Sequence, residues 1–300
     1  MTSTLRRRLL LVHAHPDDET LTTGGTIARY AAEPDTSVTL VTCTLGEQGE
    51  VIPPELAELA PDRADQLGGY RIGELAGACA ALGLGPGDHR FLGGAGRWRD
   101  TGMALAGNGI RAATPSHLHP RAFAAPEPFD EPFDEQVDAL VAVLAELRPQ
   151  VVVTYAADGG YGHPDHVRAH EITVAAVRQV PARLYFTVTG RSTLDAGLAA
   201  LADAAEMPFR LPEPDGLPSV PDAAITTRVD VTAQRAARVA ALRAHATQIA
   251  LWSSGGELGE KGFALAMSNL VAQPLLDVEE YVAADDGAPA STDLFAGVGR

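Results

Sequence analysis

The sequence is short of positive charge. Its 300 residues include 23 Lys and Arg against 39 Asp and Glu, which gives a formal net charge of −16, and Lys261 is the one lysine. Nucleic-acid affinity depends largely on Lys and Arg that neutralise phosphates, so the composition argues against a nucleic-acid partner. The same shortage excludes a polybasic membrane anchor.

Cysteines and long apolar runs are also scarce. Cys43 and Cys79 provide no disulfide framework, which suits a reducing cytoplasm. No run approaches the ~20 apolar residues of a membrane span. The apolar run 9–12 follows three arginines but stops at His13, short of the ~7–15 residues that a secretory signal needs. We therefore expect a soluble, cytoplasmic protein with no membrane partner.

Short apolar runs alternate with amphipathic ones, which predicts an α/β fold. The predicted strands are residues 9–12, 38–44, 90–92, 151–155, 182–189 and 226–231, and the predicted helices are residues 20–32, 61–82, 134–147, 165–178 and 232–248. Strands that are apolar throughout indicate burial on both faces, as in a parallel sheet. The β-α-β-α order therefore predicts a Rossmann-like architecture, a mostly parallel sheet flanked by helices and carrying long substrate loops.

The chain shows no second hydrophobic core with its own linker, so we expect a single domain over residues 1–300. Residues 101–132 are rich in Gly, Pro and Ala and too long for an ordinary connection, which predicts a loop excursion over the surface. Residues 207–221 hold five prolines and predict another loop. The last fifteen residues are small and polar, and we expect them to be loosely held.

Four of the nine histidines fall in two clusters, residues 13–19 and 161–166, and each cluster contains His-Pro-Asp. Each cluster follows a predicted strand, and the two strand ends are neighbours if the strand order reverses beside the first strand. Imidazoles and a carboxylate then face one crevice, and three such ligands suit zinc with a fourth position for water. The alternative is that each His-Pro-Asp only marks a helix N-terminus capped by its Asp.

At these two motifs the sequence resembles the zinc-dependent de-N-acetylases of the LmbE-like family, which includes the N-acetylglucosaminyl-phosphatidylinositol deacetylases. The stretches 42–47, 65–75 and 93–100 support the resemblance, which covers much of residues 9–170. Gly-Gly-Tyr-Arg at 68–71 and Ala-Gly-Arg-Trp-Arg-Asp at 95–100 narrow it to the branch that deacetylates N-acetylglucosaminyl-inositol in mycothiol biosynthesis. The resemblance thus implies a metal-dependent amidohydrolase with a small amino-sugar-inositol substrate.

The resemblance also assigns the metal site and the base. His15, Asp18 and His166 match the three zinc ligands of the family, and Asp17 matches its general base. The chemistry of the residues agrees, because a zinc-activated water needs a neighbouring carboxylate that is not itself a ligand. A site of two His and one carboxylate also suits Fe(II), so the metal expected is Zn²⁺, with Fe²⁺ as the alternative.

Five further residues receive roles from the resemblance. His163 matches an imidazole that stabilises the intermediate and can protonate the leaving amine, Asp165 would orient His163, and Tyr161 would polarise the carbonyl. Arg71 and Asp100 match substrate-binding residues. For Arg71 the alternative is a surface ion pair, and for Asp100 it is a loop-capping carboxylate.

One alternative to this hypothesis is another N-acetyl-sugar deacetylase of the same family, and two other functions also compete with it. The related amidase that cleaves mycothiol S-conjugates would share the metal site, but that family usually carries a lysine soon after the first motif, where this chain has Thr22-Thr23-Gly24. A Rossmann-like binding protein without catalysis is the other, although the first turn lacks Gly-x-Gly-x-x-Gly. The Ala- and Arg-rich composition is typical of GC-rich genomes such as those of actinobacteria, and the sequence indicates no oligomeric state.

Overall fold

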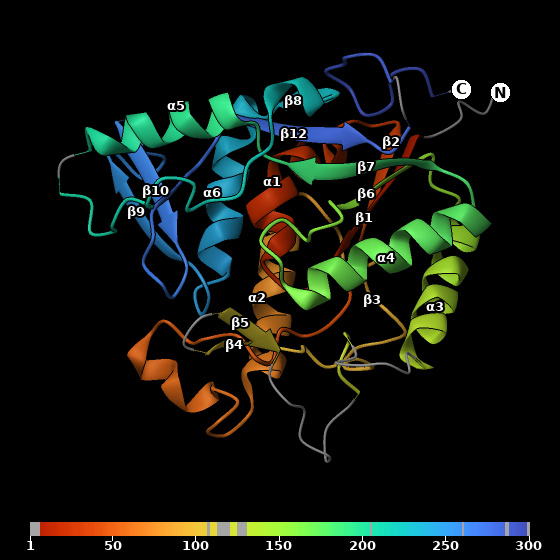
Figure 1. The fold of residues 1–300 in the computed structure, drawn as a ribbon, viewed down its shortest axis with the longest axis horizontal. Helices are drawn as coiled ribbons and strands as arrows, with labels where there is room; N and C mark the ends of the chain where they lie inside the picture. The colour runs from red at the N-terminus through yellow and green to blue at the C-terminus, as the bar shows by residue number, and fades with distance from the viewer. Residues whose placement is uncertain are drawn as a thin grey trace.

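A seven-stranded sheet forms the centre of the molecule, in the order β3-β2-β1-β6-β7-β12-β8 (Figure 1). The computed structural model describes residues 7–106, 109–112, 121–124, 131–204, 206–259, 261–285 and 288–298. The strands of the sheet are β1 (Arg7–His13), β2 (Thr36–Thr42), β3 (His89–Phe91), β6 (Val151–Tyr155), β7 (Arg183–Val188), β8 (Thr227–Asp230) and β12 (Val278–Ala283). The first five strands in sheet order, from β3 to β7, run parallel, whereas β12 is antiparallel to both of its neighbours.

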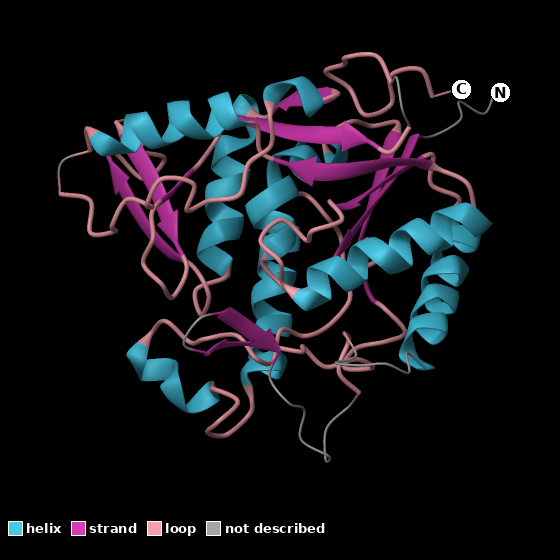
Figure 2. Cartoon of the chain, in the orientation of Figure 1, coloured by secondary structure: helices cyan, strands magenta, loops and turns pink. Residues whose placement is uncertain are grey.

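Helices cover both faces of this sheet, as the sequence predicts (Figure 2). One face carries α1 (Asp18–Ala31), α2 (Leu67–Ala81) and α6 (Arg235–Ala244), and the other carries α3 (Glu131–Leu147) and α4 (Pro164–Gln179). Strand β1 shows why both faces are apolar. Leu9 and Leu11 enter the core under α1 and α2, while Leu10 and Val12 enter the core under α3 and α4.

Two helices differ from their predicted limits by more than the others do. The helix predicted at 61–82 begins only at Leu67, because Asp65 adopts a left-handed backbone (φ 52°) and pairs with Arg99; a 3₁₀ turn, Pro54–Leu59, precedes it. The helix predicted at 232–248 ends at Ala244 after a 3₁₀ turn at its start. Its last four predicted residues instead form a turn whose side chains hydrogen-bond to α1 and α2.

The sequence patterns did not predict helix α5 or a second, smaller sheet. Helix α5 (Arg191–Ala202) packs against this antiparallel sheet of β9 (Ala250–Ser254), β10 (Gly262–Ala266) and β11 (Gln273–Pro274), seen at the left of Figure 1.

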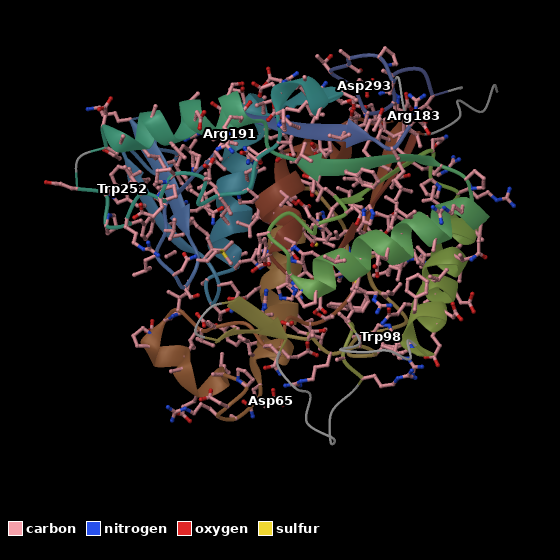
Figure 3. All side chains as sticks on the ribbon, in the orientation of Figure 1. Asp65, Trp98, Arg183, Arg191, Trp252 and Asp293 are labelled. Atoms are coloured by element: carbon pink, nitrogen blue, oxygen red, sulfur yellow. The ribbon has the colours of Figure 1, made fainter. Side chains whose placement is uncertain are left out.

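The prediction of a loosely held C-terminus is wrong for the described residues. Leu294 and Phe295 are buried, and Asp293 accepts a hydrogen bond from Tyr30 Oη at 2.7 Å; Figure 3 shows Asp293 at the end of the molecule where the termini lie.

The excursion predicted at 101–132 lies partly outside the described residues. The part that is described contains an antiparallel hairpin, β4 (Met103–Ala106) and β5 (Gly109–Ala112). Thr101 and Phe123 are buried, so these two points of the segment belong to the interior. Among the residues that the structure describes, no helix has the length and apolarity that a membrane crossing requires.

Candidate metal centre and active site

The two His-Pro-Asp motifs meet where the strand order reverses. Strands β1 and β6 pair in parallel, from Leu9 opposite Val151 to Leu11 opposite Val153, so their carboxyl ends open side by side. Both motifs also begin helices, as the alternative interpretation holds, but their carboxylates are not the caps. Asp17 precedes α1 and makes no capping bond with its side chain in the described structure, and His163 caps α4.

Three side chains converge on one point at this switch. Asp18 Oδ2 lies 3.3 Å from His15 Nδ1 and 3.3 Å from His166 Nε2. All three residues are at least nine-tenths buried. The two imidazoles, of His15 and His166, are 151 residues apart in the chain, and the β1–β6 pairing brings them together.

Hydrogen bonds fix which nitrogen of each imidazole carries the proton. His166 Nδ1 lies 3.1 Å from the carbonyl oxygen of Gly159, which only accepts, so Nδ1 is the donor. His15 Nε2 lies 3.0 Å from Asp165 Oδ2 and is likewise a donor. In the neutral rings, His15 Nδ1 and His166 Nε2 are then bare lone pairs aimed at the carboxylate of Asp18, and His166 Nε2 has no hydrogen-bond partner among the described residues.

Nitrogen lone pairs and a carboxylate oxygen that lie close together in the interior repel one another, and a bound cation removes this repulsion. The charge around them points the same way, because Asp100 and Asp165 also lie within 3.4 Å of His15. Burial by itself lowers the pKa of His15, but the neighbouring carboxylates more than offset this and hold it well above its usual value. The residues therefore fit a divalent metal, whose charge would offset the buried carboxylates.

Two other trios, in each of which all three ligand atoms lie within 4.8 Å of one another, compete for the metal. They are His15 with His163 and His166, and His15 with Asp100 and Asp165. In the first, the Nδ1 of His163 is already an acceptor for the backbone N–H of Asp165, at 3.1 Å. In the second, the carboxylate of Asp165 is fully used by the protein. In the trio of His15, Asp18 and His166, the Nδ1 of His15 and the Nε2 of His166 keep their lone pairs, and Asp18 Oδ2 accepts the backbone N–H of His15 at 2.9 Å.

Asp17 precedes Asp18 of this trio in the chain and is buried near other carboxylates. Arg71 Nη2 lies 3.1 Å from Asp17 Oδ2 and also bonds to the carbonyl oxygen of Pro16, while Nη1 donates to the carbonyl oxygen of Gly46 at 2.6 Å. Burial raises the pKa of Asp17 to about 6, although Arg71 lowers it. Arg71 is only 2% exposed, so the alternative of a surface ion pair is wrong.

His163 is held as a neutral donor. Because its Nδ1 accepts the Asp165 N–H, its hydrogen resides on Nε2. Burial, together with the nearby imidazoles of His15 and His166, lowers the pKa of His163 to about 3. The ring stacks on that of His166 with centroids 5.0 Å apart.

Asp165 orients a different histidine from the one predicted. Its contact with His163 is made by its backbone N–H, whereas its carboxylate binds His15 Nε2. That carboxylate also accepts hydrogen bonds from the N–H and hydroxyl of Thr101 and from the N–H of Ala124. The physical reason is direction, since the side chain of the first helical turn points back across the sheet edge towards β1.

The remaining predicted residues, Tyr161 and Asp100, lie beside the histidines of the site. Tyr161 is 54% exposed, and its ring centroid lies 5.0 Å from that of His166 and 6.1 Å from that of His163. Asp100 is buried and accepts the backbone N–H groups of Gln48 and Gly102, which matches the loop-capping alternative.

The sequence interpretation missed a buried pair behind Asp17. Glu19 Oε1 lies 2.8 Å from His245 Nε2, and both side chains are fully buried. Burial alone raises the pKa of Glu19, but His245 and several hydrogen bonds lower it to about 2. Burial alone lowers the pKa of His245, but Glu19 raises it above its usual value. Glu19 adjoins a motif and could have been noticed, whereas nothing in the sequence marks His245.

Comparison with known proteins settles the family. The model of the GlcNAc-PI de-N-acetylase family matches residues 10–177, which include both motifs. The chain belongs to the GlcNAc-PI de-N-acetylase family. It is 58% identical to a 1D-myo-inositol 2-acetamido-2-deoxy-alpha-D-glucopyranoside deacetylase of Saccharopolyspora erythraea over 100% of this chain and 97% of the relative. It is 56% identical to an enzyme of the same name from Actinosynnema mirum, over the full length of both. Both relatives come from actinobacteria, as the composition suggests.

Solved structures agree with this de-N-acetylase family at the level of the fold. A deacetylase of teicoplanin biosynthesis, crystallised with teicoplanin, superposes with a TM-score of 0.51 over 93% of this chain and all of its own, at 20% sequence identity. The chain is thus an enzyme of a metal-dependent deacetylase family.

Proposed function

We propose that this enzyme removes the acetyl group from 1D-myo-inositol 2-acetamido-2-deoxy-alpha-D-glucopyranoside, in mycothiol biosynthesis. The observation that carries the proposal is the approach of two imidazole nitrogens, His15 Nδ1 and His166 Nε2, to the buried Asp18 Oδ2, with the carboxylate of Asp17 on the adjacent residue. The substrate is inferred from the names of full-length relatives with more than half of their residues identical.

We assign the metal to His15, Asp18 and His166. Tetrahedral zinc with bonds of about 2.0–2.1 Å separates its ligand atoms by roughly 3.3 Å, and the two measured separations from Asp18 Oδ2 are 3.3 Å. Zn²⁺ is the ion proposed, and Fe²⁺ suits the same ligands. When bound, the metal supplies a Lewis acid that lowers the pKa of water towards ~7 and polarises the amide oxygen.

Three other side chains accept the proton of the water or stabilise the charge that develops in the reaction. Asp17 is the general base that takes the proton of the attacking water, and the guanidinium of Arg71 keeps its carboxylate ionised and aimed at the site. His163 presents its Nε2–H to the oxyanion that forms as the carbonyl carbon becomes tetrahedral. Because Nδ1 of His163 accepts a backbone N–H, we assign His163 the role of oxyanion donor and not that of acid. Asp17, which holds the proton taken from the water, would pass that proton to the leaving amine as the C–N bond breaks.

Tyr161 and Asp165 complete the proposed machinery. The hydroxyl of Tyr161 would be a second donor to the carbonyl oxygen, and its glycine-flanked loop, with Gly160 and Gly162 at φ 79° and 85°, lets the ring adjust over the substrate. Asp165 fixes the tautomer of neutral His15, with the proton on Nε2 and with Nδ1 as the ligand nitrogen.

An uncharged sugar-polyol fits the charge of this protein. A net charge of −16 would repel an anionic ligand, whereas a polyol requires only hydrogen-bonding groups. Arg71 and Asp100 remain our predicted substrate contacts, although both already bind protein groups and so also shape the pocket. We further propose that the single-domain protein works in the cytoplasm, because its only two cysteines are free and buried.

The proposal is tested by turnover of two substrates with the purified protein. We expect acetate release from the acetylated pseudodisaccharide and much slower cleavage of a bimane conjugate of mycothiol. The reverse preference would make the protein the S-conjugate amidase. Metal analysis of protein purified aerobically and anaerobically without added zinc would decide between Zn²⁺ and Fe²⁺. Asp17→Asn must lose most of the activity while metal stays bound, and full activity of this variant would refute the hydrolytic mechanism.

A further inference from the structure

The backbone of Asp17 adopts a conformation that it would not hold by itself. Its φ is 113° and its ψ is −35°, in the left-handed half of backbone space that favours glycine. Such a conformation is kept only where the surroundings enforce it. Two restraints on Asp17 are visible. Arg71 holds the side chain, and the carboxylate of Glu19 holds the backbone.

The restraint from Glu19 acts on the backbone amide of Asp17. The N–H of Asp17 donates to Glu19 Oε2 at 2.9 Å. The carbonyl oxygen of Asp17 accepts the N–H groups of Thr20 and Leu21, both at 2.9 Å, which fixes the start of α1. The peptide on the N-terminal side of Asp17 is therefore turned towards Glu19, and this sets the direction in which the Asp17 carboxylate leaves the backbone.

The Glu19 carboxylate is in turn held by a residue from the far end of the sequence. Its Oε1 faces His245 Nε2 at 2.8 Å, and the exposed fraction of both side chains is 0%. His245 lies in the turn after α6 and outside residues 10–177, the part matched by the family model. A second buried contact anchors this turn, because the N–H and hydroxyl of Thr247 donate to Glu74 of α2 at 2.8 and 2.6 Å.

We propose that His245 is a positioning residue for the catalytic base, acting through Glu19 on the backbone of Asp17. The N–H of His245 keeps the Glu19 carboxylate turned so that Oε2 receives the Asp17 N–H. Without it, Glu19 Oε1 keeps only the hydroxyl of Thr20, at 2.5 Å, as a donor among the described residues. The buried carboxylate then reorients, and Asp17 relaxes out of its left-handed conformation with its carboxylate turned from the metal site. The inference rests on the proposed function in one respect, namely the role of Asp17 as base.

Substitution of His245 tests this on the full chain with metal bound. We expect His245→Leu to lower kcat for the acetylated pseudodisaccharide by about 10–100-fold, with KM and the metal content unchanged. His245→Gln places an amide N–H near the position of Nε2 and should restore most of kcat. His245→Asn places it near Nδ1 and should not. The comparison of Gln with Asn applies even if the Leu variant fails to fold.

A double substitution shows whether His245 acts through Asp17. In an Asp17→Asn background the base is already lost, so adding His245→Leu should change the residual rate by less than about threefold. Equal effects of His245→Leu in both backgrounds, or loss of metal from the single variant, would overturn the inference. Tyr30→Phe is the matched control, because Tyr30 lies at the other end of α1 and its hydroxyl donates a partly buried hydrogen bond to the Asp293 carboxylate. It should lower the melting temperature and leave kcat within about twofold.

The two proposals fail separately. If Asp17→Asn retains the kcat of the wild type, the proposed hydrolytic mechanism fails. If Asp17→Asn is inactive but His245→Leu keeps full kcat, the mechanism stands and only the role of His245 fails.

Discussion

His163 has a structural role and a proposed catalytic role, and mutations can separate the two. It is the N-cap of α4, where its Nδ1 accepts the N–H of Asp165, and its Nε2–H is the proposed oxyanion donor. Loss of an N-cap costs about 0.5–2 kcal/mol of the free energy of unfolding. Loss of one oxyanion donor lowers kcat by about 10²–10³-fold, or roughly 2.7–4 kcal/mol of transition-state stabilisation. His163→Ala should show both losses.

His163→Asn is the control that divides the two effects. Asparagine is a strong N-cap, and its Oδ1 can accept the Asp165 N–H. The Asn side chain is too short to bring its amide to the position of the His163 Nε2–H. We therefore expect His163→Asn to recover the free energy of unfolding to within about 0.5 kcal/mol of the wild type while kcat stays as low as in the Ala variant.

The metal distinguishes His163 from its neighbour on α4. Nε2 of His166 is a bare ligand atom facing Asp18, so His166→Ala should lose metal and activity together. Both His163 variants should keep about one equivalent of metal. The assays are metal content after gel filtration, acetate release under saturating substrate and urea unfolding. Recovery of kcat in His163→Asn, or metal loss from His163→Ala comparable to that from His166→Ala, would refute the tautomer assignment.

Three further predictions follow from the packing and the metal site. In urea unfolding, Gly25→Ala should destabilise the protein by ~1–3 kcal/mol, because the added Cβ would lie 2.4 Å from Val231 Cβ. The adjacent Gly24→Ala is the control and should be neutral or stabilising, because its added Cβ would have its nearest neighbours at 3.6 Å. Phe295→Ala should cost ~3–5 kcal/mol by the same measurement, because this buried ring packs on Tyr30, and a cost near zero would restore the view of a loose C-terminus. Removal of the metal by a chelator should abolish acetate release and lower the melting temperature, and stoichiometric Zn²⁺ should restore both; activity that survives complete chelation would exclude the metal-dependent mechanism.

The elements closest to the site were the most predictable from the sequence. Strand β6 has the predicted limits, and β1, α1 and α4 differ from theirs by a few residues. The apolar runs of β1 and β6 are continuous because both faces of these strands are buried, and turn residues follow each run. Predictions were weaker where a remote contact set the boundary. Helix α6 stops at Ala244 because His245 and Thr247 turn inwards to buried carboxylates of other helices.

The sequence by itself determined the fold class, the place of the site and the residue types that build it. Two His-Pro-Asp motifs after buried strands are a local signal, and the rule for parallel sheets brings those strand ends together. Only the tertiary structure decided what each group does with its neighbours. It showed that the Asp165 carboxylate accepts a hydrogen bond from His15, that Arg71 forms a buried ion pair with Asp17, and that His245 hydrogen-bonds to Glu19. The physical reason is that hydrogen-bond direction, proton position and burial depend on atoms from distant segments, and the spacing of residues along the chain carries none of that information.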